Sequence, residues 1–242
     1  MTLSEGPGPR SVAALRLTGP ALSGILFAAL TLAVTARNAT LIGADEALSD
    51  AARSWSLHDP ALHPAMATLS RTGSSAVLVT AGALTVAVLL VRRLWREAGF
   101  VMLAAVATTL VRWVVRASVA RPRPAGRLVP ADGWAFPSGH TTSSTVAALI
   151  AVVLLIRLVG PGRSRSAAVV ALSAWAVGVG LSRVLLVVHW PTDVVGGWLL
   201  ATTVVPLCAL TVLGHGRPVT TAARRPAARS APPPGGVDGG CG

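Results

Sequence analysis

Charged side chains are scarce in this sequence, and lysine is absent from it. Only 12% of the 242 residues are charged, whereas 52% are hydrophobic and the mean hydropathy is +0.65. Soluble domains of this length usually carry about twice that charged fraction. Apolar runs of about 18 or more residues recur along the chain, and each is long enough to cross a bilayer as a helix. The composition therefore excludes a soluble domain and predicts an all-α, multi-pass membrane protein of one domain.

The basic residues are all arginines, because no lysine is present, and there are 21 of them. They outnumber the nine acidic residues and give the chain a formal charge of +12. This charge favours anionic lipid head groups or phosphorylated substrates as partners. We expect no nucleic-acid partner, because the arginines lie in short loops between apolar runs. Only two cysteines occur, Cys208 in an apolar run and Cys241 near the end of the chain, so we expect no structural disulfide.

Six apolar segments predict six transmembrane helices, at residues 17–36, 74–91, 99–115, 141–159, 167–183 and 191–213. We expect residues 17–213 to form one six-span bundle. The flanking segments 1–16 and 214–242 are polar or rich in Arg, Pro and Gly, and we expect both to be disordered. Between the first two spans Leu48, Ala52 and Trp55 share one helical face, which predicts a short helix at the membrane interface.

The distribution of arginines predicts the orientation of the bundle. Six spans place both termini on one side, together with the two tight loops near residues 92–97 and 160–166. Eleven arginines fall on that side: Arg10, Arg16, Arg92, Arg93, Arg96, Arg163, Arg165, Arg217, Arg224, Arg225 and Arg229. Because arginine-rich short loops stay in the cytoplasm, we expect both termini to be cytoplasmic. Residues 116–140 and 182–193 then both lie at the outer face, where they can form a single site.

The first of these segments carries Arg116, six further residues and then Arg123-Pro124. A guanidinium group is permanently charged and matches phosphate oxygens with two parallel hydrogen bonds. A merely basic loop is the weaker interpretation, because arginine is depleted in outer loops. Arg112, one helical turn before Arg116, either lines the same site or turns outward toward water.

The same segment ends in Pro137-Ser138-Gly139-His140, directly before the fourth span. Backbone N–H groups at a helix start are unpaired and favour an anion. Ser138 adds a hydroxyl donor, Gly139 allows close approach to the backbone, and His140 can act as an acid or a base. The alternative is an ordinary helix start with Ser138 as the capping side chain.

The second outer segment carries Ser182-Arg183, then His189, then Asp193. His189 and Asp193 are four residues apart, so they become neighbours on a helical turn. A carboxylate beside an imidazole fixes its tautomer and allows the other ring nitrogen to attack. Arg183 and His189 would point in different directions on one straight helix, so we expect a break between them. Taken alone, the His/Asp pair would be read as an interfacial histidine beside a capping aspartate.

These three elements, R-x6-RP, PSGH and SR-x5-H-x3-D, resemble the signature of the type 2 phosphatidic acid phosphatase (PAP2) superfamily. The resemblance covers residues 116–193 by motif and about 17–213 by span layout. It implies that His189 attacks phosphorus, that Asp193 orients it, and that His140 protonates the leaving oxygen. It further implies that the phosphoryl oxygens are bound by Arg116, Arg123, Ser138, Gly139 and Arg183. The sequence departs from the family at Arg116, where lysine is usual.

The resemblance implies a membrane lipid phosphate or diphosphate phosphatase that works through a phosphohistidine. An isoprenyl diphosphate, phosphatidic acid and phosphatidylglycerol phosphate all fit, and no feature chooses among them or predicts an oligomeric state. We expect no metal and no cofactor, because Asp132 and Asp193 alone are too few for a Mg²⁺ site on the outer face. Trp134 and Trp190 flank the motifs and are expected to anchor at the interface. The alternatives are a lipid-linked phosphotransferase and a non-catalytic lipid-binding protein; a transporter would need polar residues deep in several spans.

Overall fold

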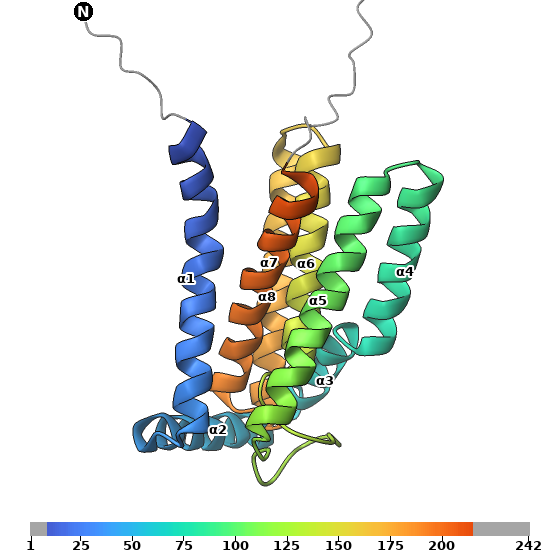
Figure 1. The fold of residues 1–242 in the computed structure, drawn as a ribbon. Helices are drawn as coiled ribbons and strands as arrows, with labels where there is room; N and C mark the ends of the chain where they lie inside the picture. Colours follow the sequence, from blue (N-terminus) through green and yellow to red (C-terminus); the bar gives the residue numbers. More distant parts are fainter. Residues whose placement is uncertain (1–8, 215–242) are drawn as a thin grey trace, which may run out of the picture.

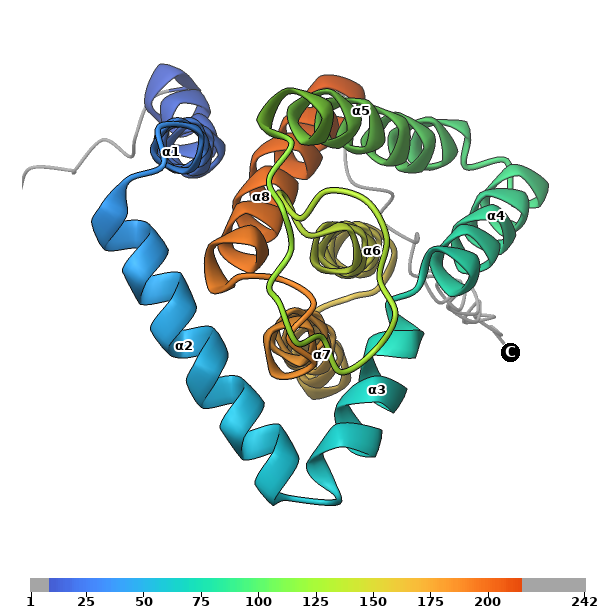
Figure 2. The same ribbon diagram turned by 90° about the horizontal axis from the view of Figure 1, so that it is seen from below.

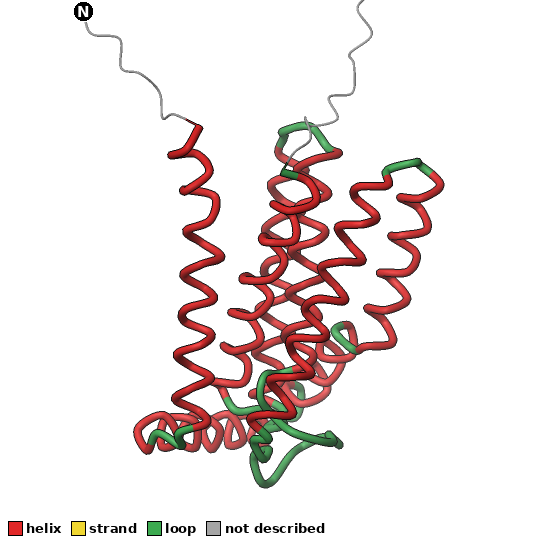
Figure 3. The backbone as a smooth tube through the Cα atoms, in the orientation of Figure 1, coloured by secondary structure: helices red, strands yellow, loops and turns green. Residues whose placement is uncertain are grey.

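The computed structural model describes residues 9–214, with side chains from Leu17 onward, and all regular secondary structure in this range is helical (Figure 1, Figure 3). The helices in chain order are α1 (Pro9–Thr35), α2 (Ala39–His58), α3 (Leu62–Thr72), α4 (Ser75–Val91), α5 (Trp95–Val119), α6 (Gly139–Leu158), α7 (Arg163–Leu185) and α8 (Pro191–Leu213). The described range contains six stretches long and apolar enough to span a membrane, with α3 and α4 counted as one. The predicted all-α, multi-pass architecture is thus confirmed.

Predicted and observed helix ends differ most at the start of the chain. Helix α1 begins at Pro9, so residues 9–16 continue the helix where we predicted disorder, whereas residues 1–8 lie outside the described range. The predicted disordered tail also lies outside that range from residue 215 onward. Helix α8 runs from Pro191 to Leu213, as predicted, because proline fits the first helical position and Gly214 follows the last apolar residue.

Helix α2 is the predicted interfacial helix, and it lies across the ends of the upright helices (Figure 1). The Asn38 side chain caps it by accepting a hydrogen bond from Leu41 N at 3.1 Å. Leu48 and Trp55 are exposed, as expected for side chains that meet lipid. The neighbouring strip of the helix is small and mostly polar, with Asp45, Ser49, Ala52 and Ser56 buried against the bundle. The prediction that Ala52 shares the lipid-facing side with Leu48 and Trp55 is therefore wrong, because its small side chain packs against the bundle.

The bundle is centred on α6, α7 and α8, and α1 to α5 surround them when the molecule is seen from below (Figure 2). Glycines allow close approach of neighbouring side chains. A β-carbon at Gly196 would lie 2.7 Å from the Phe136 ring, and one at Gly197 would lie 3.0 Å from Thr141 Cβ. The start of α8 is therefore packed tightly against the start of α6.

The two segments that carry the motifs lie at one end of the bundle. Residues 120–138, between α5 and α6, pass over the ends of the central helices (Figure 2). They are joined to the α7–α8 connection by a hydrogen bond of 3.1 Å from Leu128 N to Leu186 O. The turns after α4 and α6 lie at the opposite end, together with the start of α1 and the end of α8 (Figure 1). The fold thus brings residues 116–140 and 182–193 together.

Candidate active site

The connection between α7 and α8 contains the predicted break between Arg183 and His189. Helix α7 ends at Leu185, and Val187 adopts φ 54°, a left-handed conformation that is strained for a β-branched residue. The Arg183 carbonyl accepts hydrogen bonds from both Val188 N (3.2 Å) and His189 N (3.3 Å). The backbone thus turns sharply and returns the His189 side chain to the bundle, where it is 2% exposed.

His189 and Asp193 form the predicted pair at the start of α8. The distance from His189 Nδ1 to Asp193 Oδ2 is 3.4 Å, and the same oxygen accepts a hydrogen bond of 2.8 Å from Trp190 N. The other ring nitrogen, Nε2, lies 3.0 Å from Arg123 Nη1. Because a guanidinium group can only donate, Nε2 accepts this bond and Nδ1 carries the proton that faces Asp193. This tautomer leaves a lone pair on Nε2.

The second oxygen of Asp193 belongs to an ionic network that the sequence analysis did not include. Arg121 Nη1 binds Asp193 Oδ1 at 2.9 Å, and Arg121 Nη2 binds Asp45 Oδ2 from α2 at 2.6 Å. Asp45 Oδ1 also accepts a hydrogen bond of 3.0 Å from Thr192 N. Arg121 was visible inside the first motif, whereas Asp45 lies far upstream in a helix that carries no motif.

Arg123 and Arg116 are both held by the loop before α6. Arg123 binds Gly133 O at 2.9 Å and Asp132 O at 3.0 Å, and Arg116 binds the same Asp132 carbonyl at 3.1 Å. A further hydrogen bond of 2.6 Å joins Arg123 to Val188 O. Gly133 has φ 66°, and a β-carbon there would collide with Arg116 Nη2, so this position requires glycine. Arg123 thus reaches the α7–α8 connection, whereas the hydrogen bond of Arg116 goes to the loop before α6.

The start of α6 is tied to α8, because Ser138 N donates a hydrogen bond of 3.0 Å to Asp193 O. Ser138 is fully buried and occupies the cap position of α6, but its side chain makes no capping hydrogen bond. Its hydroxyl oxygen instead accepts a hydrogen bond of 2.9 Å from Thr141, which leaves its own O–H free to donate. The interpretation of Ser138 as a capping side chain is therefore wrong.

His140 and Arg183 are the remaining site residues that the sequence predicts. His140 lies within electrostatic range of His189, Arg183, Arg123 and Arg112, so the two imidazoles and the guanidinium groups share one region at one end of the bundle. Arg183 is 6% exposed and donates to Ser70 Oγ at 2.5 Å. Its Nε atom is buried without a hydrogen-bond partner among the described residues. A buried donor without a partner is costly, and an anionic ligand would satisfy it.

The environment keeps His189 neutral. Burial lowers the pKa of His189 to about 4, although the hydrogen bond and charge of Asp193 raise it; the positive charges of Arg123 and Arg183 add to the lowering. Burial and the neighbouring Arg116 lower the pKa of Arg123 from its usual value. The imidazole is thus unprotonated at neutral pH and its Nε2 lone pair is available as a nucleophile.

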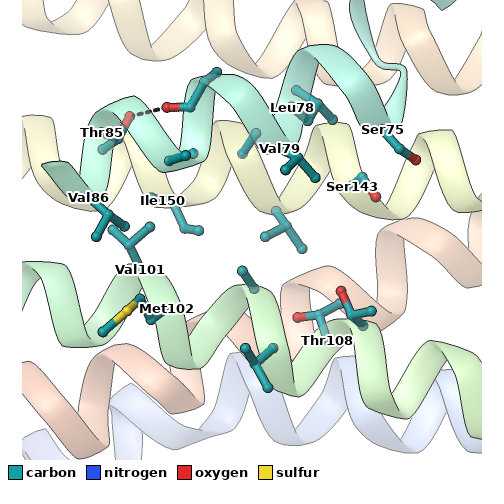
Figure 4. Close-up of a pocket in the computed structure, with 18 of the residues that line it drawn as sticks. Ser75, Leu78, Val79, Thr85, Val86, Val101, Met102, Thr108, Ser143 and Ile150 are labelled. Atoms are coloured by element: carbon teal, nitrogen blue, oxygen red, sulfur yellow. Dashed lines mark hydrogen bonds between the residues drawn. The ribbon is translucent and has the colours of Figure 1, made fainter.

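An apolar cavity of about 780 Å³ lies between α4, α5 and α6 (Figure 4). Its walls include Leu78, Val79, Met102 and Ile150, and its polar residues include Arg112 and Ser143. Val79 is 70% exposed, which shows that the cavity wall reaches the surface of the bundle that faces lipid. The apolar lining fits a hydrocarbon chain.

The described residues bring no three His, Cys, Asp or Glu side chains together as a metal ion would require.

Trp134 and Trp190 flank the motifs, and Trp134 is exposed. Trp190 Nε1 donates to Pro122 O at 2.9 Å, and its ring lies 5.4 Å from the Arg121 guanidinium. Trp190 therefore holds the motif-bearing loop in addition to any contact with lipid.

Fold and site together define a multi-pass helical membrane protein with a cluster of arginine and histidine side chains at one end of the bundle. The sequence profile of the PAP2 superfamily matches residues 100–217. Phosphatidylglycerophosphatase B of Bacillus subtilis (strain 168) is 32% identical over 180 residues, which cover 71% of this chain and 84% of that protein. The chain belongs to the PAP2 superfamily.

Further similarities agree with this assignment. Phosphatidylglycerophosphatase B of Escherichia coli (strain K12) is 44% identical over 73 residues, and the match covers 30% of this chain and only 27% of that protein. The crystal structure of a transmembrane PAP2 type phosphatidylglycerolphosphate phosphatase from Bacillus subtilis matches with a TM-score of 0.73 and 27% identity, over 82% of this chain and 98% of that one. The structure of Aquifex aeolicus LpxE, at 23% identity and a TM-score of 0.50, shares the fold.

Proposed function

We propose that this protein is a membrane lipid phosphate or diphosphate phosphatase in which His189 forms a covalent phosphohistidine. The observation that carries the proposal is the state of His189, whose Nδ1 faces Asp193 while Nε2 accepts a hydrogen bond of 3.0 Å from Arg123. A neutral imidazole with its lone pair among guanidinium groups is suited to attack an anionic phosphorus centre. Membership of the PAP2 superfamily and the names of the relatives support this chemistry.

In the proposed first step, a phosphoryl oxygen replaces His189 as the partner of Arg123, and Nε2 attacks phosphorus. The bond from phosphorus to the leaving oxygen breaks as the bond to nitrogen forms, and His140 gives its proton to that oxygen, which stays on the lipid alcohol of a monophosphate or on the inner phosphate of a diphosphate. Arg116, Arg123 and Arg183 bind the phosphoryl oxygens, with the Ser138 hydroxyl and the Gly139 amide as further donors. These fixed positive groups stabilise the transition-state charge, which is the main requirement of phosphoryl transfer.

In the second step, water attacks the phosphohistidine while His140 accepts a proton from it. The bond from phosphorus to Nε2 breaks, orthophosphate leaves, and His189 returns to its neutral state. No metal ion is required, because several guanidinium groups supply the charge that Mg²⁺ would otherwise provide. Transfer to an acceptor other than water would make the same protein a phosphotransferase.

The proposed substrate is a lipid, with its phosphate at the motif-bearing end and its chain in the bundle. The apolar cavity of about 780 Å³ between α4, α5 and α6 supports this assignment, because Arg112 is among its lining residues and packs against the start of α6. We place the site at the outer face of the cell membrane and both termini in the cytoplasm. The support is the arginine content of the loops at the opposite end.

Phosphate release tests this function. Purified protein in detergent micelles should release orthophosphate from phosphatidic acid, phosphatidylglycerol phosphate or an isoprenyl diphosphate without an added acceptor, and EDTA should leave the rate unchanged. The His189→Ala variant should lose activity by at least about a thousandfold while its helical content is retained. A strict metal requirement, a strict acceptor requirement, or full activity of His189→Ala would each contradict a part of the proposal.

A further inference from the structure

Arg112 is an arginine near the site to which the proposed phosphatase mechanism gives no task. It lies on α5 one helical turn before Arg116, so both side chains are on the same face of that helix. Its guanidinium packs against the start of α6, because a β-carbon at Gly139 would lie only 3.1 Å from Arg112 Nη1. The same side chain lines the apolar cavity between α4, α5 and α6. Arg112 thus borders both the phosphate-binding region and the expected position of the lipid chain.

The charge of Arg112 has no partner of opposite sign within residues 17–214. Arg116, Arg123 and Arg183 each donate at least one hydrogen bond to the protein, whereas Arg112 makes no hydrogen bond or ion pair with a described residue. It lies within a membrane-spanning helix and is only partly exposed. A cation at such a position normally pairs with a polar group or marks a ligand pathway.

Outward turning of the side chain toward water is the simpler explanation, but the contacts argue against it. A side chain that snorkels carries its charged end away from the apolar interior. Arg112 instead borders the apolar cavity together with Thr142 and Ser143 of α6, and it touches Gly139. A ligand that balances its charge would therefore approach from the cavity between α4, α5 and α6, next to the start of α6.

We propose that Arg112 binds a second phosphoryl group in the lipid head, so that the site takes lipids carrying two phosphates. This inference rests on the phosphatase function proposed above. Arg123, Arg183 and His189 hold the phosphoryl group that is transferred, and Arg112 holds the phosphate that remains on the lipid. A lipid with a single phosphate leaves Arg112 without a counter-charge, and binding should be weaker. The second phosphate is either the inner one of a diphosphate or a phosphodiester separated from the terminal phosphate by glycerol.

The Arg112→Gln variant tests this proposal, because it removes the charge and keeps a polar side chain. The kcat/KM for an isoprenyl diphosphate, phosphatidylglycerol phosphate and phosphatidic acid should be measured with the wild-type protein, the variant and Arg37→Gln. Arg37 is an exposed arginine at the same end of the bundle, between α1 and α2. We expect Arg112→Gln to lose about tenfold or more with at least one two-phosphate lipid and less than about threefold with phosphatidic acid.

The pattern of losses identifies the source of the second phosphate. A selective loss with the diphosphate assigns Arg112 to the inner phosphate, and one with phosphatidylglycerol phosphate assigns it to the phosphodiester. Equal losses with all three lipids, or no loss with any of them, would overturn the proposal. Arg112→Lys should recover part of the selective loss, because it restores the charge without the guanidinium fork.

A binding measurement separates this inference from the proposed function. Methylenediphosphonate cannot be hydrolysed, so its dissociation constant can be compared with that of orthophosphate by titration calorimetry even if the protein shows no turnover. Arg112→Gln should raise the dissociation constant of methylenediphosphonate about tenfold and that of orthophosphate less than threefold. Equal changes would rule out the inner phosphate of a diphosphate as the ligand of Arg112, and equal changes without a selective loss for phosphatidylglycerol phosphate would overturn the proposal. Wild-type protein that releases no phosphate from any lipid would contradict the phosphatase function alone.

Discussion

At the scale of single residues, Asp193 connects the proposed nucleophile to a charge network. One oxygen lies 3.4 Å from His189 Nδ1, and the other binds Arg121 at 2.9 Å. Arg121 in turn binds Asp45, so a single guanidinium lies between two carboxylates that are both buried. Because Asp193 favours the protonated imidazole, any change in this balance of charge should alter the pKa of His189.

The pH dependence of kcat/KM tests this coupling. The pKa of His189 is lowered to about 4, so the imidazole is neutral and competent above that pH, and activity should fall as the pH drops through about 4. Arg121→Gln removes a positive charge next to Asp193, which should raise the pKa of His189 and move this acid limb to higher pH by about one unit. Asp45→Asn removes a negative charge instead, and the limb should move to lower pH.

Opposite shifts distinguish a role in charge balance from a purely structural one. A variant that only loses packing would lose activity without moving the acid limb. Acid limbs that move in the same direction in both variants, or that do not move, would therefore contradict the proposed coupling. Circular dichroism should confirm that both variants keep their helical content, since breaking a buried ion pair can cost about 3–5 kcal/mol. Arg71→Gln is the matched control, because this exposed arginine of α3 makes no side-chain hydrogen bond with the described residues.

Sequence reasoning was effective for residues whose partners are local. The His189 and Asp193 pair was predicted from a spacing of four, and the break after Arg183 was predicted from helical geometry. The role of Asp45 could not be predicted, because its contact with Thr192 joins positions 147 residues apart and no short pattern records it. The alternative interpretation of Ser138 as a capping side chain was wrong for a related reason: its hydroxyl accepts a hydrogen bond from the Thr141 hydroxyl and not from a backbone amide of α6, and its own amide donates to Asp193 O of α8.

At the scale of helices and loops, apolar length and proline position predicted most of the spans. Helix α8 begins at Pro191 as predicted, whereas α5 extends from Trp95 to Val119, past both predicted ends. The polar residues at the ends of α5 continue its hydrogen-bonding pattern, so hydropathy alone underestimates its length. Helix α2 was predicted as an interfacial helix, but its buried polar face and the supply of Asp45 to the site depend on tertiary packing.

The orientation of these elements in the membrane is testable by cysteine labelling. Ala125 lies in the loop between α5 and α6, and Ser164 lies at the start of α7; both are exposed. In a Cys241→Ser background, where the remaining Cys208 is buried, Ala125→Cys should react with a membrane-impermeant maleimide on intact cells. Ser164→Cys should react only after the membrane is permeabilised. The reverse pattern would contradict an outward-facing site and cytoplasmic termini.

At the scale of the whole molecule, the bundle brings two segments that are distant in sequence to the same end. The loop from residue 120 to 138 crosses the ends of the central helices, and α2 lies along the same end (Figure 2). Arg123 from one segment contacts His189 from the other at 3.0 Å, and Arg121 reaches Asp193 and Asp45. The proposed mechanism depends on this convergence, because residues 182–193 supply the proposed nucleophile and Arg183, whereas Arg116, Arg121 and Arg123 come from the other segment.

Trapping of the phosphoenzyme tests this central claim most directly. Wild-type protein mixed with a lipid phosphate labelled with phosphorus-32 and quenched within milliseconds should carry label that is stable in base and labile in acid, as expected for phosphohistidine. Peptide mapping should place the label at His189, and His189→Ala should carry none. Label on another residue, or turnover of a lipid phosphate with no trapped label and no loss in His189→Ala, would contradict the account.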